Sequence, residues 1–399
     1  MTSPPTSTEL GGQRRSRAVH FGWVSLLQDL GSKMVVPILP LFLALQLGAS
    51  AFVVGLIDGV GAVSAAIVAP IAGRMSRALP VRWVRAGYGL SSAMKLALAF
   101  ATTWPAVLGI RVADRAGKGI RDAPRDVLLA EAPAHRHGAT FGIQQAMDKT
   151  GGFLGPLAGL VAYELSDQSF DAVFVVAFIP CALSVALLWR IPPPPVRPAS
   201  PDDAAPTSDF AAATSARASP AQRRALAAIA LHSLGFVSVS LLLLRALDVD
   251  ATVAQILIGY AVLRLITAIA SYPIGRLVDA TSARAISIAG MLVSAGAIAL
   301  IALATTPAAV WVALGTVGLA DAMTRGPVKA WLLSLGPKAA SGAVLGDRSA
   351  ITGIAGLVSS IAVGTAWGST GQLPLLVAAA VAASGAALAA TIAQRDLQG

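Results

Sequence analysis

Residues 285–305, AISIAGMLVSAGAIALIALAT, contain no charged side chain. An α-helix rises 1.5 Å per residue, so a stretch of about 20 residues crosses the roughly 30 Å hydrocarbon core of a bilayer. Residues 225–244 and 373–392 are similarly apolar. Over all 399 residues, 55% are hydrophobic and 13% are charged, about half the charged share of soluble proteins. The sequence therefore predicts an all-α integral membrane protein, with the lipid bilayer as a partner.

Apolar runs of this kind recur along the whole chain. They predict 12 transmembrane helices in two six-helix pseudo-symmetric halves around a central cavity. The predicted spans are 20–46, 52–73, 83–102, 105–130, 139–162, 171–190, 225–246, 252–276, 284–304, 307–332, 343–366 and 373–393.

The basic residues of the loops predict the orientation. They concentrate in every second loop, whereas the connections LGASA, TTWP, TTP and STGQ contain none. Because cytoplasmic loops are enriched in Lys and Arg, we expect a multi-pass protein of the plasma (inner) membrane with both termini in the cytoplasm.

The formal charge of +10 would suggest nucleic-acid binding if the protein were soluble. Here the basic residues are dispersed among membrane spans, so no nucleic-acid partner is expected. The single cysteine, Cys181, excludes an internal disulfide, and no metal or other cofactor is expected.

Composition divides the chain into five segments. We expect a cytoplasmic N-terminal tail at 1–19, an N-terminal six-helix half at 20–190, a cytoplasmic flexible linker at 191–224, a C-terminal six-helix half at 225–393 and a cytoplasmic C-terminal tail at 394–399. The linker is rich in proline, serine and alanine, which indicates a mobile tether, with a docking segment as the alternative.

Three short motifs recur in the same order in both halves. PIAGR at 70–74 returns as PIGR at 273–276, and Gly138–Gly142 returns as Gly342–Gly346. Asp114-x3-Lys118-Gly119 returns as Asp321-x3-Arg325-Gly326. The nearly constant displacement indicates an internal duplication. A parallel repeat of six-helix halves is typical of secondary transporters, whose solute site lies between the halves near the midplane.

The stretch RVADRAGKGIRDAPRD at 111–126 is unusually charged for a membrane span. Residues 111, 115, 118, 122 and 125 share one helical stripe, and Asp114 lies one turn before Lys118. A charge at the bilayer centre costs about 2.5–3.5 kcal/mol, so these side chains must face protein or water. They either form a buried ion-pair lattice or line a polar solute pathway, and we favour the pathway. We expect Arg111, Arg115 and Lys118 to point into the space between the halves, with Arg121 turned partly away.

Other spans also carry charges. The cationic candidates for substrate binding are Lys33, Arg111, Arg115, Lys118, Arg264 and Arg325, and the acidic candidates for proton coupling are Asp29, Asp58, Asp114, Asp148 and Asp321. Spans 3, 6, 9 and 12 contain almost none apart from Lys95. We therefore expect these four spans to face lipid and the other eight to line or border the cavity. We further expect Lys118 and Arg325 to form an anion-binding pair, with Asp114 and Asp321 as their resting partners.

The pattern of spans, repeat and linker resembles the major facilitator superfamily over essentially the whole chain. Gly275-Arg-Leu-Val-Asp279 matches its G-x-x-x-D loop signature, whose Gly275 and Asp279 the resemblance places at a gate. The corresponding loop of the first half has Gly73 and Arg77, where Arg77 replaces the acidic residue. The resemblance implies a transporter that works as a monomer and is not an enzyme.

Span 5 looks like the antiporter signature of drug–proton exporters in that superfamily. The residues concerned are Gly142, Gly151, Gly155, Pro156 and Gly159, although Leu160 replaces a second terminal glycine. Arg111 occupies the place of the span-4 arginine that the superfamily ties to proton coupling. DRAGKGIRDAPRD itself resembles a bacterial permease subgroup.

The excess of intramembrane Lys and Arg over Asp favours an anionic or zwitterionic solute. We therefore expect secondary active transport of a small organic solute by alternating access, as proton-coupled export of an anionic or amphiphilic compound. Proton-coupled uptake of an organic anion is the alternative. An alternative from a different functional class is a membrane-embedded enzyme or a scaffold. No nucleophile, metal cluster or phosphate-binding loop in the sequence favours an enzyme.

Overall fold

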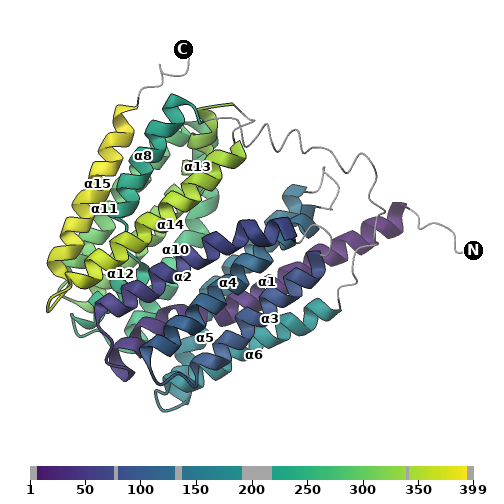
Figure 1. Ribbon diagram of the computed structural model, residues 1–399, viewed down its shortest axis with the longest axis horizontal. Coiled ribbons are helices and arrows are strands. Elements are labelled where there is room, and N and C mark those ends of the chain that lie inside the picture. The colour runs from purple at the N-terminus through teal and green to yellow at the C-terminus, as the bar shows by residue number, and fades with distance from the viewer. Residues whose placement is uncertain (1–6, 76–79, 131–136, 191–217, 338–340, 393–399) are drawn as a thin grey trace, which may run out of the picture. The chain divides into compact units, whose positions relative to one another are not determined.

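The computed structural model describes residues 7–75, 80–130, 137–190, 218–337 and 341–392, all of which form helices or the short connections between them (Figure 1). The chain divides into two compact units, one comprising residues 1–49 and 60–193 and the other residues 50–59 and 194–399. The first ten residues of this second unit belong to the stretch that sequence analysis assigned to the N-terminal half.

The described residues of the first unit form six helices. They are α1 (Ser7–Leu41), continued by the π-helical turn η1 (Phe42–Gln46), α2 (Ala51–Met75), α3 (Pro80–Leu98), α4 (Trp104–Ala130), α5 (His137–Leu165) and α6 (Phe170–Trp189). The beginning of α2 is grouped with the second unit, where Gly55 and Gly59 lie against Ser360 and Leu357.

The remaining helices of the described ranges belong to the second unit. They are α8 (Pro220–Leu234), α9 (Val239–Leu247), α10 (Val253–Ala280), α11 (Ala283–Leu303), α12 (Pro307–Arg325), α13 (Pro327–Ser334), α14 (Ser341–Thr365) and α15 (Gln372–Thr391). The first of them begins with a capping box, in which Ser219 and Gln222 satisfy each other's backbone N–H groups and Pro220 occupies the first turn.

Two of the predicted continuous spans are broken. The seventh span separates into α8 and α9 at Gly235, where a side chain would collide with the carbonyl of Ala378 on α15. The tenth span separates into α12 and α13 between Gly326 and Pro327, because proline lacks an N–H group and clashes with the preceding turn.

The helices pack in the same order in both units. In the first unit α1 packs on α5 and α6, and α3 packs on α4 and α6. In the second unit α8 packs on α14 and α15, and α11 packs on α12 and α15. When the helices are numbered by span within each unit, these pairings correspond, as an internal duplication requires.

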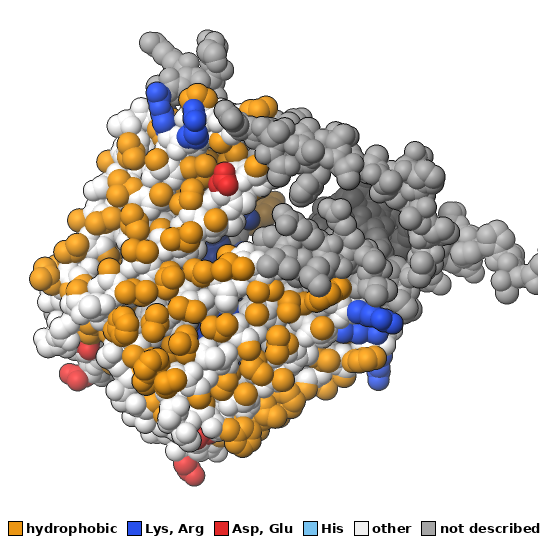
Figure 2. All heavy atoms as spheres, in the orientation of Figure 1, with side chains coloured by type: hydrophobic (Ala, Val, Ile, Leu, Met, Phe, Trp, Pro, Cys, Tyr) orange, Lys and Arg blue, Asp and Glu red, His pale blue; other side chains and the backbone are white. Residues whose placement is uncertain are grey.

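Among the described residues, nine helical segments are long and apolar enough to cross a membrane. The predicted spans outside this set are α3, α4 and α5, which carry the charged side chains described below. Hydrophobic side chains are spread across the described surface seen in Figure 2, and large ones such as Phe100, Ile269 and Leu373 are exposed. Exposed apolar surface on this scale fits a lipid environment, so the predicted all-α membrane fold is confirmed.

Candidate functional site

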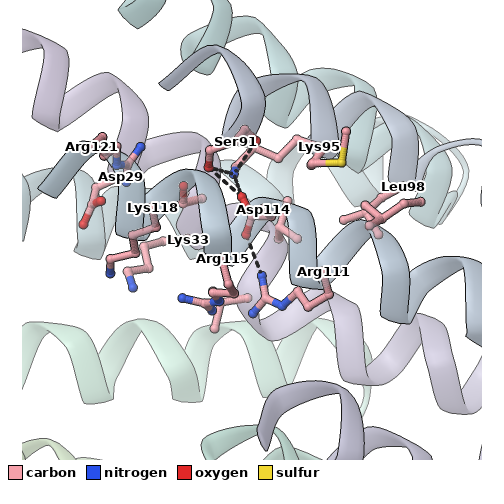
Figure 3. A pocket seen from close by; sticks show the side chains of 15 residues that line it. Asp29, Lys33, Ser91, Lys95, Leu98, Arg111, Asp114, Arg115, Lys118 and Arg121 are labelled. Carbon is pink, nitrogen blue, oxygen red and sulfur yellow. Dashed lines mark hydrogen bonds and ion pairs between the residues drawn. The ribbon is translucent and has the colours of Figure 1, made fainter. Parts of the chain in front are cut away.

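A small polar cavity lies within the first unit between α1, α3 and α4 (Figure 3). Its volume is about 30 Å³, enough for roughly two water molecules. Six cationic and two acidic side chains line it, a formal excess of four positive charges. The cationic ones are Lys33, Lys95, Arg111, Arg115, Lys118 and Arg121, and the acidic ones are Asp29 and Asp114.

The contact between α3 and α4 is close enough to bring charged side chains of both helices together. Gly87 and Gly117 face each other, and a Cβ atom on Gly117 would lie 2.9 Å from the carbonyl oxygen of Gly87. Small residues at such a crossing let two backbones approach. This approach sets the rotation of α3, so that Lys95 reaches Asp114 on α4.

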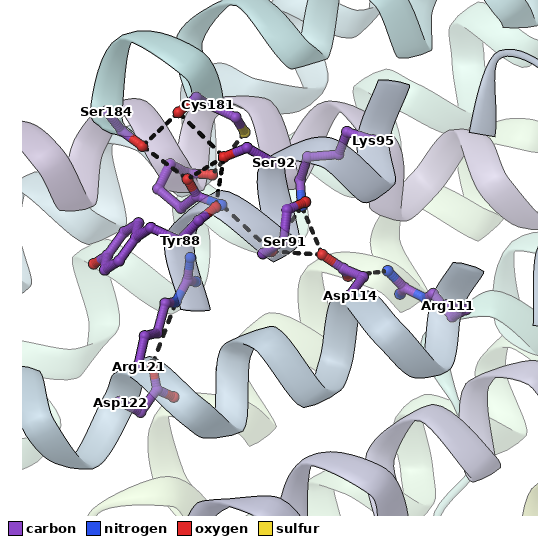
Figure 4. Close-up of polar contacts among 11 residues, drawn as sticks. Tyr88, Ser91, Ser92, Lys95, Arg111, Asp114, Arg121, Asp122, Cys181 and Ser184 are labelled. Atoms are coloured by element: carbon purple, nitrogen blue, oxygen red, sulfur yellow. Dashed lines mark hydrogen bonds and ion pairs between the residues drawn. The ribbon is translucent and has the colours of Figure 1, made fainter. Parts of the chain in front are cut away.

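Asp114 is the centre of a buried ion-pair cluster (Figure 4). Its carboxylate accepts hydrogen bonds from Lys95 Nζ at 2.8 Å, from Ser91 Oγ at 2.6 Å and from Arg111 Nη1 at 3.2 Å. Lys95 also donates to the Ser91 carbonyl at 3.0 Å. Lys95 and Arg111 are 3% and 5% exposed, so this cluster is an ion-pair lattice between two helices.

The position of Lys95 corrects two expectations. The partners of Asp114 in the structure are Lys95 and Arg111, not Lys118. The third span was expected to face lipid, yet α3 supplies Lys95 and Ser91 to the cavity. The signal in the sequence was Lys95 itself, a charge in the interior of that span, ten residues beyond Arg85 near its start.

A chain of hydrogen bonds continues this cluster towards α1 and α6. Gln28, which is 1% exposed, donates to Ser91 at 3.5 Å and accepts from Ser184 at 2.8 Å. Ser92 and the buried Cys181 complete the network shown in Figure 4. These uncharged members could not be predicted from the sequence, because serine and glutamine carry no charge that distinguishes them within a membrane span.

Arg115 and Lys118 differ from the other cations of α4. Both are half-buried and line the cavity, and neither forms an ion pair with any residue that the structure describes. Figure 3 shows them beside Lys33 and Asp29 of α1, which line the same space. Within the charged stretch, Arg111 and Asp114 therefore belong to the lattice, whereas Arg115 and Lys118 line the cavity without an ion pair to a described residue.

Arg121 is also part of the cavity wall, although it was expected to turn partly away. Its guanidinium lies over the ring of Tyr88, with its central carbon 4.3 Å from the ring centroid. Its Nε atom is 3.6 Å from the carboxylate of Asp122, which makes an ion pair but is too long for a hydrogen bond. Tyr88, which is 1% exposed, was not among the residues predicted for the site.

The glycines of α5 lie along α1. A Cβ atom on Gly155 would come 2.6 Å from the Cβ of Lys33, and one on Gly159 would touch Met34. Gly151 similarly faces the Leu26 carbonyl. Gly142 and Pro156 belong to the same helix, as does Asp148, which is half-buried. This glycine face lets α5 pack closely against the helix that carries Asp29 and Lys33.

In the second unit, Asp321 and Arg325 form the expected intrahelical pair at 2.8 Å. Arg325 is 69% exposed at its side chain. Arg264 on α10 is half-buried, and its Nε atom has no hydrogen-bond partner among the described residues. Arg325 and Lys118 belong to different units, so their pairing around one solute stays a prediction.

The remaining predicted residues lie near helix ends or in α2. Gly73 is in the last turn of α2, and Asp58 is half-buried in the same helix. Gly275 and Asp279 are exposed near the end of α10. Arg77 lies outside the described residues. The gating roles stay predictions.

Comparisons with known proteins agree on the kind of protein that contains this cavity. The sequence profile of the Major Facilitator Superfamily matches residues 21–360. An uncharacterised MFS-type transporter of Methanocaldococcus jannaschii is 31% identical over 172 residues, which are 43% of each chain. The staphyloferrin B transporter of Staphylococcus aureus is 29% identical over 168 residues, or 40% of each chain. The chain thus spans less than half the length of the curated relatives it matches.

Solved transporter structures share the fold. A point mutant of the nucleoside transporter NupG superposes with a TM-score of 0.77 at 13% identity, covering 94% of this chain and 99% of that one. A bacterial homologue of the human lysosomal transporter Spinster, in its inward-facing occupied conformation, gives a TM-score of 0.72 at 14% identity. That match covers 96% of this chain and 98% of the other. At such identities the likeness concerns the fold alone.

Proposed function

The chain belongs to the Major Facilitator Superfamily, whose members are membrane transporters and not enzymes, and we propose that it transports a small organic anion. The observation that carries this proposal is the excess of four positive charges in the cavity of the first unit. Lys95 and Arg111 form ion pairs with Asp114, and Arg121 stacks on Tyr88. By contrast, Arg115 and Lys118 form no ion pair within the described part of the chain.

Two such cations on one helix turn face an electrostatic cost. They repel each other, and removing them from bulk water weakens their hydration. An anionic group placed between them relieves both effects, because it supplies the missing opposite charge and accepts their hydrogen bonds. An uncharged or cationic solute would leave the repulsion in place. The cavity therefore favours a carboxylate or phosphate group over either alternative.

The transport cycle is proposed to be proton-coupled export by alternating access across the plasma membrane, in a monomer with both termini in the cytoplasm. The glycine face of α5 supports export, since it resembles the antiporter signature. One relative is named for the transport of staphyloferrin B.

The acid that exchanges the proton is chosen from the five acidic candidates. Asp114 is committed to two ion pairs and Asp321 to one. Asp29 and Asp148 each have a lysine within one turn of their own helix. We keep Asp58 ahead of the other four as the exchanging acid because it is half-buried in α2 and its own helix carries no Lys or Arg within one turn of it.

The proposal is tested with Lys118→Met in purified protein and proteoliposomes. Binding of a panel of monocarboxylates, dicarboxylates and phosphate esters is measured, together with flux of each bound compound under an imposed pH gradient. Methionine keeps the length of the side chain and removes the charge. We expect anion affinity to fall about tenfold or more, because a hydrogen bond to a charged group contributes about 1.5–3 kcal/mol.

Lys329→Met is the matched control, because Lys329 is exposed on α13 and does not line the cavity. Unchanged anion affinity in Lys118→Met, with lowered stability, would assign Lys118 to the lattice and overturn the anion site. Flux that ignores the pH gradient would remove proton coupling while leaving anion transport intact. Uptake, rather than extrusion, driven by the gradient would reverse the proposed direction.

A further inference from the structure

Arg121 is the most deeply buried cation at one end of the cavity. It is 5% exposed. Among the described residues its Nε and Nη1 atoms have no hydrogen-bond partner. The guanidinium group has five N–H donors in a fixed plane and accepts no hydrogen bond. Leaving two of its nitrogen atoms unsatisfied in a buried position is costly, and most buried polar groups in native proteins avoid it.

The surroundings hold this guanidinium in one orientation. The ring of Tyr88 lies under it at 4.3 Å, and stacking on an aromatic face keeps a planar cation flat. Gly87 makes room for it, because a Cβ atom there would lie 2.8 Å from the Cβ of Arg121. The site is therefore built before any ligand arrives, with Tyr88 as its positioning residue.

The same cavity also contains the two unpaired cations of α4. Lys118 lies one turn before Arg121, and Arg115 lies nearly two turns before it. With a rise of 1.5 Å per residue, the three positions are spread over about 9 Å of helix. One small anionic group can contact the Arg115 and Lys118 end, but it leaves the Nε and Nη1 atoms of Arg121 without a hydrogen bond to a described residue, since the carboxylate of Asp122 lies 3.6 Å from Nε.

We propose that Arg121, held on Tyr88, is a second anion subsite, so that the transported solute carries two anionic groups and belongs to the dicarboxylates or larger polycarboxylates. This inference rests on the proposed anion transport and narrows its substrate class. A planar carboxylate accepts two parallel hydrogen bonds from a guanidinium. The alternative is that water molecules in the 30 Å³ cavity satisfy Arg121 permanently.

The test uses straight-chain dicarboxylates from malonate to suberate, with butyrate as the acid that has a single carboxylate. Affinities are measured on the purified full chain by calorimetry, at constant ionic strength. We expect wild-type protein to bind at least one dicarboxylate about tenfold more tightly than butyrate, with an optimum chain length. In Arg121→Gln the dicarboxylate affinity should fall about tenfold, whereas butyrate binding should change less than about twofold.

Two further variants make the result specific. Arg121→Lys keeps the charge and loses the planar fork, so it should retain part of the dicarboxylate preference. It also serves if the glutamine variant fails to fold. Arg82→Gln is the matched control, because Arg82 is exposed on α3 and is not part of the cavity wall. It should leave every affinity unchanged.

Three results would overturn the inference. They are wild-type protein without a preference for any dicarboxylate, equal losses for butyrate and dicarboxylates in Arg121→Gln, and a preference that survives in that variant. If butyrate binding still depends on Lys118 in these cases, the proposed anion transport stands and only the second subsite fails. If no anion from any panel depends on Lys118, the proposed function fails as well.

Discussion

Replacing Lys95 by methionine should destabilise the protein far more than it weakens its affinity for anions. Methionine keeps the apolar length of the side chain but removes the ammonium, which donates to Asp114 at 2.8 Å and to the Ser91 carbonyl and hydroxyl at 3.0 and 3.1 Å. Removing one partner of a buried ion pair costs about 3–5 kcal/mol, mostly because the other charge is left behind.

The structure places the expected cost at the lower end of that range. The Asp114 carboxylate would keep two hydrogen bonds, from Arg111 at 3.2 Å and from Ser91 at 2.6 Å. We expect a loss of about 3 kcal/mol, equivalent to roughly a 150-fold change in the unfolding equilibrium. The measurement is reversible denaturation of the purified protein in mixed micelles, followed by tryptophan fluorescence.

A double-mutant cycle with Asp114→Asn isolates the pair. Removing both charges should cost about 1.5–3 kcal/mol less than the two single losses added together. The reason is that the double variant leaves neither charge of the pair buried without its partner. Additivity within about 0.5 kcal/mol would refute the lattice assignment. Lys118→Met provides the contrast, since it should weaken anion binding with little effect on stability.

Two other predictions concern helix packing and pH. Gly155→Ala should destabilise the protein by about 1–3 kcal/mol through overpacking, because its Cβ would lie 2.6 Å from that of Lys33. The control Gly356→Ala, with no atom within 4 Å of the new Cβ, should be neutral or stabilise the protein by up to about 1 kcal/mol. If both variants lost the same free energy of unfolding in a denaturation assay, the close α1–α5 contact would be contradicted. At the end of α9, burial raises the pKa of Asp248 above its ordinary 3.8, although Arg245 opposes the shift. The contribution of Asp248 to stability is therefore present in acid and is lost as the pH rises through that raised pKa. Thermal unfolding over a pH series should show the wild type losing stability relative to Asp248→Asn across this interval, and parallel curves would refute the role of Asp248.

The sequence by itself determined the architecture, because that architecture follows from properties additive along the chain. Runs of apolar residues long enough to cross a bilayer must become helices, since backbone groups in lipid can bond only within the segment. The repeated motifs and the span count then indicate the superfamily without knowledge of any contact. The free-energy cost of a charge in hydrocarbon likewise predicts that the charged side chains of 111–126 avoid lipid, and in the structure several of them line a cavity.

The two broken spans were harder to foresee. Pro327 is visible in the sequence as a local cause of the break between α12 and α13. The break at Gly235 is different, because glycine is tolerated in membrane helices. There the cause is the backbone of α15, which lies against Gly235, and no local pattern shows that contact.

Only the tertiary structure decided which charges of the site are already paired. Along α4, Lys118 follows Asp114 by one helical turn, and this spacing predicted an ion pair between the two residues. In the structure, Asp114 pairs with Lys95 of α3 instead. The contact of Gly87 with Gly117 fixes the rotation of α3 about its own axis, and this rotation places Lys95 beside Asp114. Helical periodicity fixes which residues share a face, but the face that a neighbouring helix turns towards them depends on packing between distant segments. That packing leaves Arg115 and Lys118 in the cavity wall without an ion pair to any described residue.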